Sequence, residues 1–337
     1  MISTLKAVAL KLKKHQRKTF FRARRKPVIK HLFPKKISIS NSIRIEICGA
    51  CNAKCLFCHS GKVPFEKNKM MSPDFFEKIL LHLKDMNLLS ESVFLYSRGE
   101  PFMHKEIGKI LDICRDYQLN ALISTNASRV PNLTRNQWKT IKFLKVSISG
   151  ITEESYKLIY GLNVSQILKN VEKIAHKVTA SCKLSVNWLR YTFNAKEETE
   201  ARKWLESLGY FFKAQPATLI QIEKLMDLKE GRLSEKEIKD IKDYLLLDEK
   251  RNNPLRQLIF DKPNSTIKKK AANLVCSQWN HIIVHNDGEL LKCCGIPTFY
   301  PENRLGKILN YTAEDIKNKK YEIDDMCNKC IKYGLTL

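Results

Sequence analysis

The sequence lacks long apolar runs. No window of the 337 residues approaches 18 consecutive apolar residues, and the N-terminus has no continuous hydrophobic core like that of a secretory signal. These absences argue against a membrane-spanning helix and predict a soluble, cytoplasmic protein. The chain also lacks internal repeats, but its 43% of hydrophobic residues exclude disorder of the whole chain and suffice for one large domain or two modest ones.

Acidic residues are missing from the start of the chain. None precedes Glu46, whereas 13 of the 60 Lys and Arg residues lie within residues 1–36, so about half of the net charge of +25 belongs to a basic tail. Leu5, Val8 and Leu12 would share one face of a helix, which predicts weak contact with an anionic membrane. Contact with nucleic acid and organelle targeting are alternatives, and a plain solvated tail is the favoured interpretation.

Short β-branched runs alternate with amphipathic stretches from Ile43 to Lys213, as in βα units around a parallel sheet. Six units are fewer than the eight of a full barrel, so the predicted fold is α/β, a partial (β/α)6 barrel. The predicted strands are 43–47, 93–97, 119–124, 144–149, 184–191 and 210–213. Helices are predicted after Ser72-Pro73, over 107–114, around Trp138, over 153–178 with a break at Gly161, and over 197–208.

The alternation stops after Gln215, and a polar, Lys-rich stretch from Ser234 to Lys250 is predicted to be helical. We predict four parts: a basic tail over 1–38, a barrel over 39–233, a helical linker over 234–265, and a small C-terminal domain over 266–337.

The eleven cysteines are an odd number in a chain without an export signal, which favours metal or redox chemistry over a disulfide framework. Cys114 has the helical spacing of a small buried hydrophobic residue, and Cys182 stands apart. The others form two clusters: Cys48, Cys51, Cys55 and Cys58, and then Cys276, Cys293, Cys294, Cys327 and Cys330.

The first cluster places Cys51, Cys55 and Cys58 in a loop directly after the first predicted strand. Three thiolates within eight residues suit zinc or an iron–sulfur cluster, and the x3 then x2 spacing favours iron–sulfur because structural zinc sites usually come as two CxxC-like pairs. Cys48 also forms a CxxC with Cys51, so a fully ligated site is an alternative. Its position at the end of the strand argues against that alternative.

This loop, with Phe57 at the aromatic position, resembles the CxxxCxΦC signature of radical S-adenosylmethionine (radical SAM) enzymes. Three later segments are similar to that family's GGEP, STNG and SIDG motifs: residues 97–101, 124–126 and 147–150. Arg98, Ala127 and Ser149 depart from those motifs. The resemblance implies S-adenosylmethionine contacts through Phe57, Gly99, Glu100, Pro101, Asn126, Ser147 and Ser149.

The resemblance also implies a chemistry. A 4Fe–4S cluster on Cys51, Cys55 and Cys58 leaves one iron open for S-adenosylmethionine, which the reduced cluster cleaves to a 5′-deoxyadenosyl radical that abstracts hydrogen from the substrate. A reducing partner such as flavodoxin or ferredoxin is then expected.

The second cluster reads Cys276, eleven residues, Gly288, four residues, Cys293, followed by Cys327 and Cys330. It resembles the auxiliary iron–sulfur domain of radical SAM enzymes in its short twitch form, related to SPASM domains. Because the CX5CX3C of the longer form does not follow Cys330, a second 4Fe–4S cluster is expected and a third is not. Structural zinc is the alternative. The turn at 286–288 predicts a hairpin of 281–285 with 289–292, leaving Cys294 as a spare thiol.

Four cysteines leave no iron open, so the second cluster is predicted to carry electrons. We therefore expect an oxidoreductase that dehydrogenates a polyol, a sugar or a similar small molecule, similar to the 2-deoxy-scyllo-inosamine dehydrogenase type. The alternatives are a radical SAM peptide- or protein-modifying maturase, and a nucleic-acid or membrane-surface binding protein with structural metal clusters.

A hydroxyl oxidation needs a base, for which Arg190 and Tyr191 are candidates by position alone. Strand alternation puts them on opposite faces, and structural pairing is the favoured interpretation for both. His59 and His104 are predicted to be solvated loop residues.

Overall fold

The computed structural model describes residues 42–58, 70–219, 222–246, 276–296 and 300–332. The chain divides into two compact units, Met1–Ile37 and Ser38–Leu337, and all described residues belong to the second. The predictions for Leu5, Val8, Leu12 and His59 lie outside the described residues.

Six parallel strands run in the order β6-β5-β4-β3-β2-β1, which is the partial barrel that the alternating sequence predicts. The sheet does not close on itself. Its strands are β1 (Ser42–Ile45), β2 (Ser92–Phe94), β3 (Asn120–Thr125), β4 (Ile141–Ser147), β5 (Lys183–Arg190) and β6 (Phe211–Pro216).

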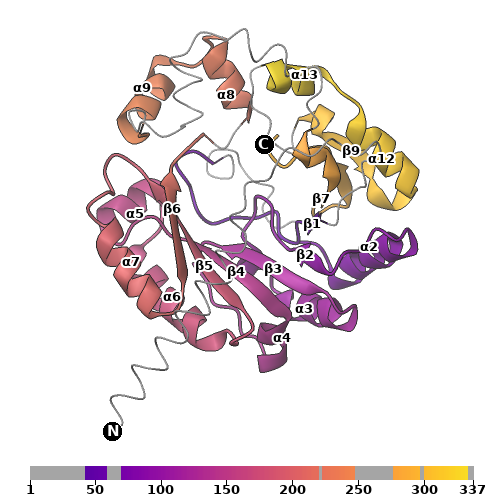
Figure 1. The fold of residues 1–337 in the computed structure, drawn as a ribbon, viewed down its shortest axis with the longest axis horizontal. Helices are drawn as coiled ribbons and strands as arrows, with labels where there is room; N and C mark the ends of the chain where they lie inside the picture. Colours follow the sequence, from indigo (N-terminus) through magenta and orange to yellow (C-terminus); the bar gives the residue numbers. More distant parts are fainter. Residues whose placement is uncertain (1–41, 59–69, 220–221, 247–275, 297–299, 333–337) are drawn as a thin grey trace, which may run out of the picture. The chain divides into compact units, whose positions relative to one another are not determined.

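Helices α2 to α7 lie on the outer side of this curved sheet (Figure 1). Ser72 caps the first of them by accepting a hydrogen bond from the Phe75 N–H, and Pro73 occupies its first turn. Gly161 ends α5 with φ at +66°, a conformation that favours glycine. The helices are α2 (Pro73–Asp85), α3 (Ile107–Asp116), α4 (Arg135–Thr140), α5 (Glu153–Tyr160), α6 (Val164–Lys177) and α7 (Glu198–Ser207).

The core lies between this layer of helices and the outer face of the sheet. Ile43 and Ile45 are fully buried there, whereas Arg44 between them is only partly buried on the inner face. Cys114 is fully buried in α3, which confirms the prediction of a small hydrophobic residue.

After β6 come α8 (Ile222–Lys229) and α9 (Glu235–Tyr244), and Ser234, where the predicted helical segment starts, caps α9. The predicted end of this helix at Lys250 lies outside the described residues. No described helix is long and apolar enough to cross a membrane.

The C-terminal part adds three strands to the same sheet. The predicted hairpin forms from β7 (His281–Val284) and β8 (Glu289–Leu291), and Gly288 has φ at +83° in its turn. The first of these strands pairs parallel to β1, so the sheet continues to nine strands and ends in β9 (Arg304–Lys307). The sequence did not predict this pairing, nor β9, α12 (Ala313–Tyr321) and α13 (Asp325–Lys332).

Candidate cofactor and metal sites

The loop that carries Cys51, Cys55 and Cys58 is fixed to the end of α5. The Lys54 N–H donates to the Tyr160 carbonyl at 2.8 Å, and the Leu56 N–H donates to the Ile159 carbonyl at 2.9 Å. These bonds occupy carbonyls that the helix end leaves unpaired, so they hold the loop at low cost. The side chains of Cys51, Cys55 and Cys58 are all partly buried there.

The three thiols lie close enough to act on one another. Burial raises the pKa of Cys51 to about 12, with smaller contributions from Glu100, Cys58 and Cys48 that also raise it. Burial, then Cys58 and Cys51, raises the pKa of Cys55 further. Neutral thiols are therefore favoured in the protein alone, and a bound metal would have to stabilise the thiolates.

The donor set fits an iron–sulfur cluster. Within the described ranges, no three His, Cys, Asp or Glu side chains are arranged to hold a single metal ion. A four-iron cluster instead distributes its thiolates over separate irons, and soft sulfur donors are the ligands that such clusters take.

Cys48 is a poor fourth ligand in this conformation. Its side chain is 2% exposed, and its thiol donates to the Ala50 carbonyl at 3.5 Å. Burial raises its pKa to about 11. These contacts agree with the expectation that Cys48 belongs to the end of the first strand.

The loop after β2 packs against the cysteine loop. The Glu100 N–H donates to the Ala50 carbonyl at 2.8 Å, which joins the two loops directly. A Cβ added at Gly99 would lie only 1.8 Å from the Cys48 carbonyl oxygen, so the approach needs glycine. Pro101 is buried and begins a short 3-10 helix, Pro101–Met103.

Glu100 joins the loops after β2 and β3. Its buried carboxylate accepts hydrogen bonds from the Thr125 hydroxyl and the Asn126 N–H, both at 2.6 Å, and from the Phe102 N–H at 3.0 Å. Burial raises its pKa to about 7, although these three donors act in the opposite direction. The carboxylate therefore fixes two loops of the site, and a contact with S-adenosylmethionine stays a prediction.

Asn126 lies against the cysteine loop. Its side-chain amide donates to Asn52 Oδ1 at 3.1 Å and lies 3.9 Å from Cys51 Sγ. An N–H near a thiolate sulfur stabilises its charge, so Asn126 fits a position beside a cluster ligand.

The two predicted serines differ. Ser147 lies in β4 opposite Asn187 of β5 and is partly buried, whereas Ser149 is fully buried. The Ser149 hydroxyl accepts hydrogen bonds from the Tyr160 hydroxyl and the Leu189 N–H, both at 2.9 Å. The cofactor contact of Ser149 stays a prediction, and these bonds favour a structural role.

Tyr191 lies beside the first cysteine site. Its ring stacks on Phe57 with centroids 6.4 Å apart, and it is 4% exposed. Burial raises the pKa of Tyr191, and Cys55 and Cys58 raise it further. Both aromatic residues therefore shield the thiols from water.

Arg190 and His104 have structural partners. Arg190 forms a bidentate ion pair with Glu198 of α7, with donor–acceptor distances of 2.6 and 2.8 Å. His104 is 4% exposed and its Nε2 lies 2.8 Å from the Met71 carbonyl oxygen, so the prediction of a solvated loop histidine was wrong. The motif around it offered no signal of burial.

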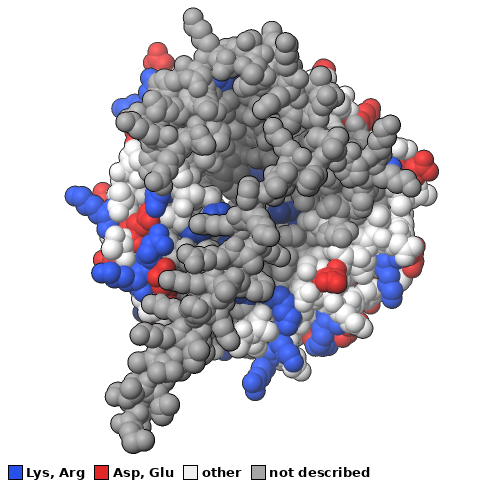
Figure 2. Space-filling view, in the orientation of Figure 1, with Lys and Arg blue, Asp and Glu red and all other residues white. Residues whose placement is uncertain are grey.

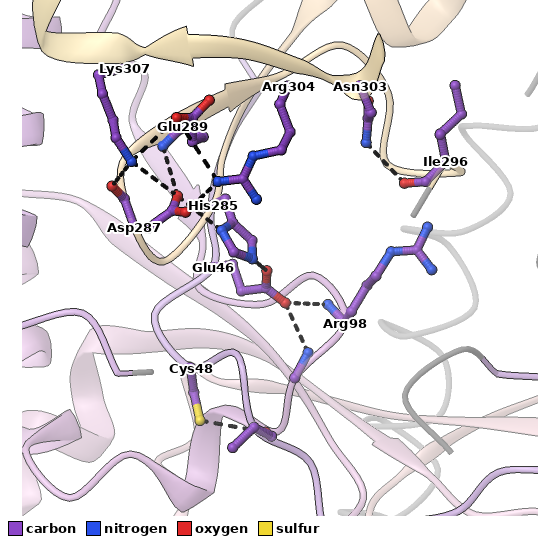
Figure 3. A network of polar contacts seen from close by, with 12 residues as sticks. Glu46, Cys48, Arg98, His285, Asp287, Glu289, Ile296, Asn303, Arg304 and Lys307 are labelled. Atoms are coloured by element: carbon purple, nitrogen blue, oxygen red, sulfur yellow. Dashed lines mark hydrogen bonds and ion pairs between the residues drawn. The ribbon is translucent and has the colours of Figure 1, made fainter. Parts of the chain in front are cut away.

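A polar network links the loop after β2 to the C-terminal hairpin (Figure 3). The buried Glu46 carboxylate accepts the N–H groups of Arg98 and Gly99 at 2.7 and 2.9 Å, and its second oxygen lies 3.6 Å from His285 Nε2. The other ring nitrogen of His285 lies 2.9 Å from Asp287 in the hairpin turn. This network passes directly from one cysteine-bearing part of the chain to the other.

Arg98 makes a second link between the two parts. Its guanidinium donates to the Cys294 carbonyl at 2.9 Å, next to Cys293 in the chain. Arg98 stands where the resembled motif has glycine, and no sequence pattern indicated this role. Cys294 itself contacts Gln278, with its sulfur 3.0 Å from Oε1.

The four cysteines predicted for the second cluster line one cavity. Cys276 directly precedes the 3-10 helix Ser277–Asn280 before β7, Cys293 follows β8, and Cys327 and Cys330 lie in α13. The cavity is lined by Cys276, Cys293, Cys327, Cys330, Ile222, Gln278, Trp279, Lys292 and Ile296. Cys276 and Cys330 are more than fifty positions apart in the sequence, yet the fold brings all four sulfur donors to one cavity. Cys294 is not among the lining residues.

Two buried lysines accompany these four cysteines. Lys320 is 2% exposed, and its ammonium donates to the carbonyls of Leu291 at 3.0 Å and Lys292 at 2.5 Å. Burial lowers its pKa to about 8, against the effect of Cys293, Cys294 and Cys276. Lys292 is 3% exposed and pairs with Asp324, whose other oxygen accepts the Cys327 N–H at 2.7 Å.

Sequence reasoning missed both lysines. Neither has a motif, and only the folded chain brings them to the cavity. Their positive charges would offset the negative charge of thiolates in this cavity, which fits a four-cysteine metal centre.

Comparison with known proteins gives a family for the barrel. Residues 45–198 match the model described as the Radical SAM superfamily. This part of the chain is a radical SAM domain.

The curated relatives match part or most of the chain. A probable GTP 3′,8-cyclase of Methanococcus vannielii is 25% identical over 170 residues, which cover 50% of this chain and 56% of that protein. A protein of the same name from Methanocaldococcus jannaschii is 22% identical over 264 residues, covering 75% of this chain and 84% of that protein. The chain thus spans little more than half of the first relative.

Among solved structures, Streptococcus suis SuiB bound to the precursor peptide SuiA is similar in fold. It superposes with a TM-score of 0.58 at 16% identity, over 87% of this chain and 66% of that one. At this identity the likeness concerns the fold alone, and it agrees with a partial barrel followed by a smaller C-terminal part.

Proposed function

We propose that this chain is a radical SAM oxidoreductase with two 4Fe–4S clusters. Cys51, Cys55 and Cys58 would hold the cluster that binds S-adenosylmethionine, and Cys276, Cys293, Cys327 and Cys330 would hold an auxiliary cluster. The observation that carries this proposal is the convergence of those last four cysteines on one cavity, in a chain whose barrel is a radical SAM domain.

When bound, the first cluster supplies the electron that cleaves S-adenosylmethionine. The residues of the chain position and protect the site. Phe57 and Tyr191 exclude water, Asn126 lies 3.9 Å from the Cys51 sulfur, and Glu100 holds the loops after β2 and β3 together. Gly99 lets the loop after β2 approach the cysteine loop.

The auxiliary centre would accept an electron. Four thiolates leave no coordination position for substrate, so its use is electron transfer, and a substrate that loses both a hydrogen atom and an electron is oxidised. Dehydrogenation of a polyol, a sugar or a similar molecule is therefore the proposed reaction class.

A second candidate follows from the names of the curated relatives. Both are called probable GTP 3′,8-cyclase, so the substrate would be a nucleotide and the outcome cyclisation instead of dehydrogenation. A nucleotide would need cations in the barrel. Strands β1, β4 and β6 carry the cations Arg44, Lys145 and Lys213. Burial lowers the pKa of Lys145, and the charges of Arg44 and Lys213 lower it further.

The decisive experiment measures 5′-deoxyadenosine after anaerobic reconstitution with iron and sulfide and addition of S-adenosylmethionine and dithionite. We expect the product from the wild type and none from Cys51→Ala. Cys294→Ala is the matched control, since that cysteine does not line the cavity, and it should retain activity. No product from the wild type would refute both enzymatic candidates and leave a binding protein with structural metal clusters.

A further inference from the structure

The inner face of the barrel sheet carries cations. Arg44 of β1 lies on this face, and its guanidinium carbon is 5.0 Å from the ring centroids of both Phe94 and Tyr96. The guanidinium also donates to the Tyr96 carbonyl at 3.4 Å, which helps to hold its position. A planar cation held between aromatic rings is ready to bind a ligand.

Lys145 of β4 reaches the same place. Its ammonium lies 5.4 Å from the centroid of the Tyr96 ring. Tyr96 follows β2, and β3 lies between β2 and β4 in the sheet. Ser124 of β3 pairs with Lys145, and this small residue leaves room for the lysine side chain. Burial lowers the pKa of Lys145, and the positive charges of Arg44 and Lys213 lower it further.

These three cations have no acidic partner within ion-pair distance among the residues that the structure describes. Glu46, the acidic residue nearest to Arg44 along the chain, is occupied by the N–H groups of Arg98 and Gly99 and lies beside His285. In Figure 2, Lys and Arg atoms are visible near the centre of the view.

Arg44 and Lys145 are partly buried and Lys213 is exposed, and the repulsion between the two partly buried like charges costs stability in the ligand-free protein. Apolar side chains at the same positions would fill the inner face without that cost. Binding of an anion would explain this group of cations. Several positive charges around one space raise the local concentration of anions and stabilise a bound anion.

We propose that Arg44 and Lys145, with Lys213 beside them, bind the anionic group of the substrate, a phosphate or a carboxylate. The inference rests on the proposed function in one respect, that the substrate enters this barrel. Arg44 and Lys145 lie near the carboxyl ends of β1 and β4, the edge of the sheet from which the Cys51 loop emerges. Ligands of parallel α/β sheets bind at this edge.

Titration calorimetry of the full-length, anaerobically reconstituted protein at low salt tests the site, with pyrophosphate and citrate as probes. The variants are Arg44→Gln and Lys145→Gln, and the matched control is Lys173→Gln, on an exposed position of α6. We expect each inner variant to weaken binding about tenfold or more and the control to leave it unchanged. Binding of pyrophosphate alone identifies a phosphate, and binding of citrate alone a carboxylate.

The inference is overturned if the wild type binds neither probe, or if all four proteins bind with the same affinity. Thermal unfolding without a probe gives a second readout. Lys145→Gln should unfold at a higher temperature than the wild type because it removes repulsion, and a lower temperature would identify Lys145 as a structural cation instead.

A parallel assay of 5′-deoxyadenosine separates this inference from the proposed function. Loss of probe binding with retained S-adenosylmethionine cleavage supports both. Probe binding that depends on Arg44 and Lys145 in a protein that cleaves no S-adenosylmethionine would leave the anion site standing and refute the proposed function.

Discussion

The two cysteine groups lie in different electrostatic surroundings. Near the first, the Glu100 carboxylate adds to the burial that raises the pKa of Cys51 and Cys55. Near the second, two buried lysines, Lys292 and Lys320, lie beside the cavity. The first site thus has the Glu100 carboxylate close to its thiols, and the second has two ammonium groups together with one carboxylate, Asp324, which pairs with Lys292.

This difference predicts the direction of electron flow. Reduction adds negative charge to a cluster, so a nearby carboxylate lowers its reduction potential and a nearby ammonium raises it. The first site is then the better donor and the second the better acceptor. That order suits a protein that starts a radical reaction at the first site and collects an electron at the second.

Removing ligands from the second site should produce the largest effect. We expect about eight irons per chain in the reconstituted wild type and about four in Cys327→Ala/Cys330→Ala, from one four-iron cluster at each site. Iron and acid-labile sulfide analysis measures both. A wild-type count near four would show that the second cysteine site holds no four-iron cluster and is a different kind of site, such as structural zinc.

Cleavage of S-adenosylmethionine should persist in that double variant, because its ligands and those of the first site lie on different elements. Cys294→Ala should keep the full iron content. Its thiol contacts Gln278 and does not line the cavity.

The pH dependence of stability should be the next largest effect. Burial raises the pKa of Glu100 from 4.5 to about 7, so the folded protein binds more protons than the unfolded chain between these values. Stability therefore falls as the pH rises from about 4.5 to 7, by about 3 kcal/mol for this group. Urea unfolding of the cluster-free protein at several pH values measures the slope.

Glu100→Gln has no proton to bind, so its free energy of unfolding should lack this component. Glu77→Gln, at an exposed position of α2, is the control and should follow the wild type. If the free energy of unfolding changed with pH in the same way in the wild type and in Glu100→Gln, the raised pKa would not belong to Glu100.

The sequence predicted the barrel because each of its elements has a local signal. Ser72-Pro73 begins a helix, Gly161 ends one, and alternating residues such as Ile43 and Ile45 mark the strand face that packs on the helices. The turn with Gly288 likewise predicted the hairpin. These signals depend on neighbours along the chain, which a sequence displays directly.

Long-range contacts had no such signal. The pairing of β7 with β1 joins residues more than two hundred positions apart, and Arg98, Glu46 and Lys320 acquire their roles only through that pairing and the packing around it. Buried polar residues such as His104 were missed for the same reason. Their partners are carbonyls of other segments, which the sequence does not identify.

Close packing of the two loops at the first site gives a smaller prediction. In Gly99→Ala, the new Cβ would lie 1.8 Å from the Cys48 carbonyl oxygen, so one loop must move. We expect a loss of about 1–3 kcal/mol in the free energy of unfolding and weaker binding of S-adenosylmethionine. Gly209→Ala has nothing within 4 Å of its Cβ but a φ of +89°, so it controls for backbone strain without a close approach and should leave binding unchanged. Unaltered binding in Gly99→Ala would refute the close approach.

The charge of Lys320 provides the finest test of the comparison. Its pKa of about 8 leaves it mostly protonated at neutral pH, beside the carbonyls of Leu291 and Lys292. For one charge at an assumed separation of about 8 Å and an effective dielectric constant of about 20, Coulomb's law gives a change in the energy of reduction on the order of 2 kcal/mol, or roughly 50–100 mV. Lys320→Met should therefore lower the midpoint potential of the auxiliary cluster by that amount and leave the potential of the first cluster unchanged. Redox titration followed by electron paramagnetic resonance distinguishes the two clusters, and Lys317→Met, exposed on the same helix, should shift neither. Equal shifts in both clusters would mean that the lysine acts on the fold as a whole, and the contrast between the two sites would then not be electrostatic.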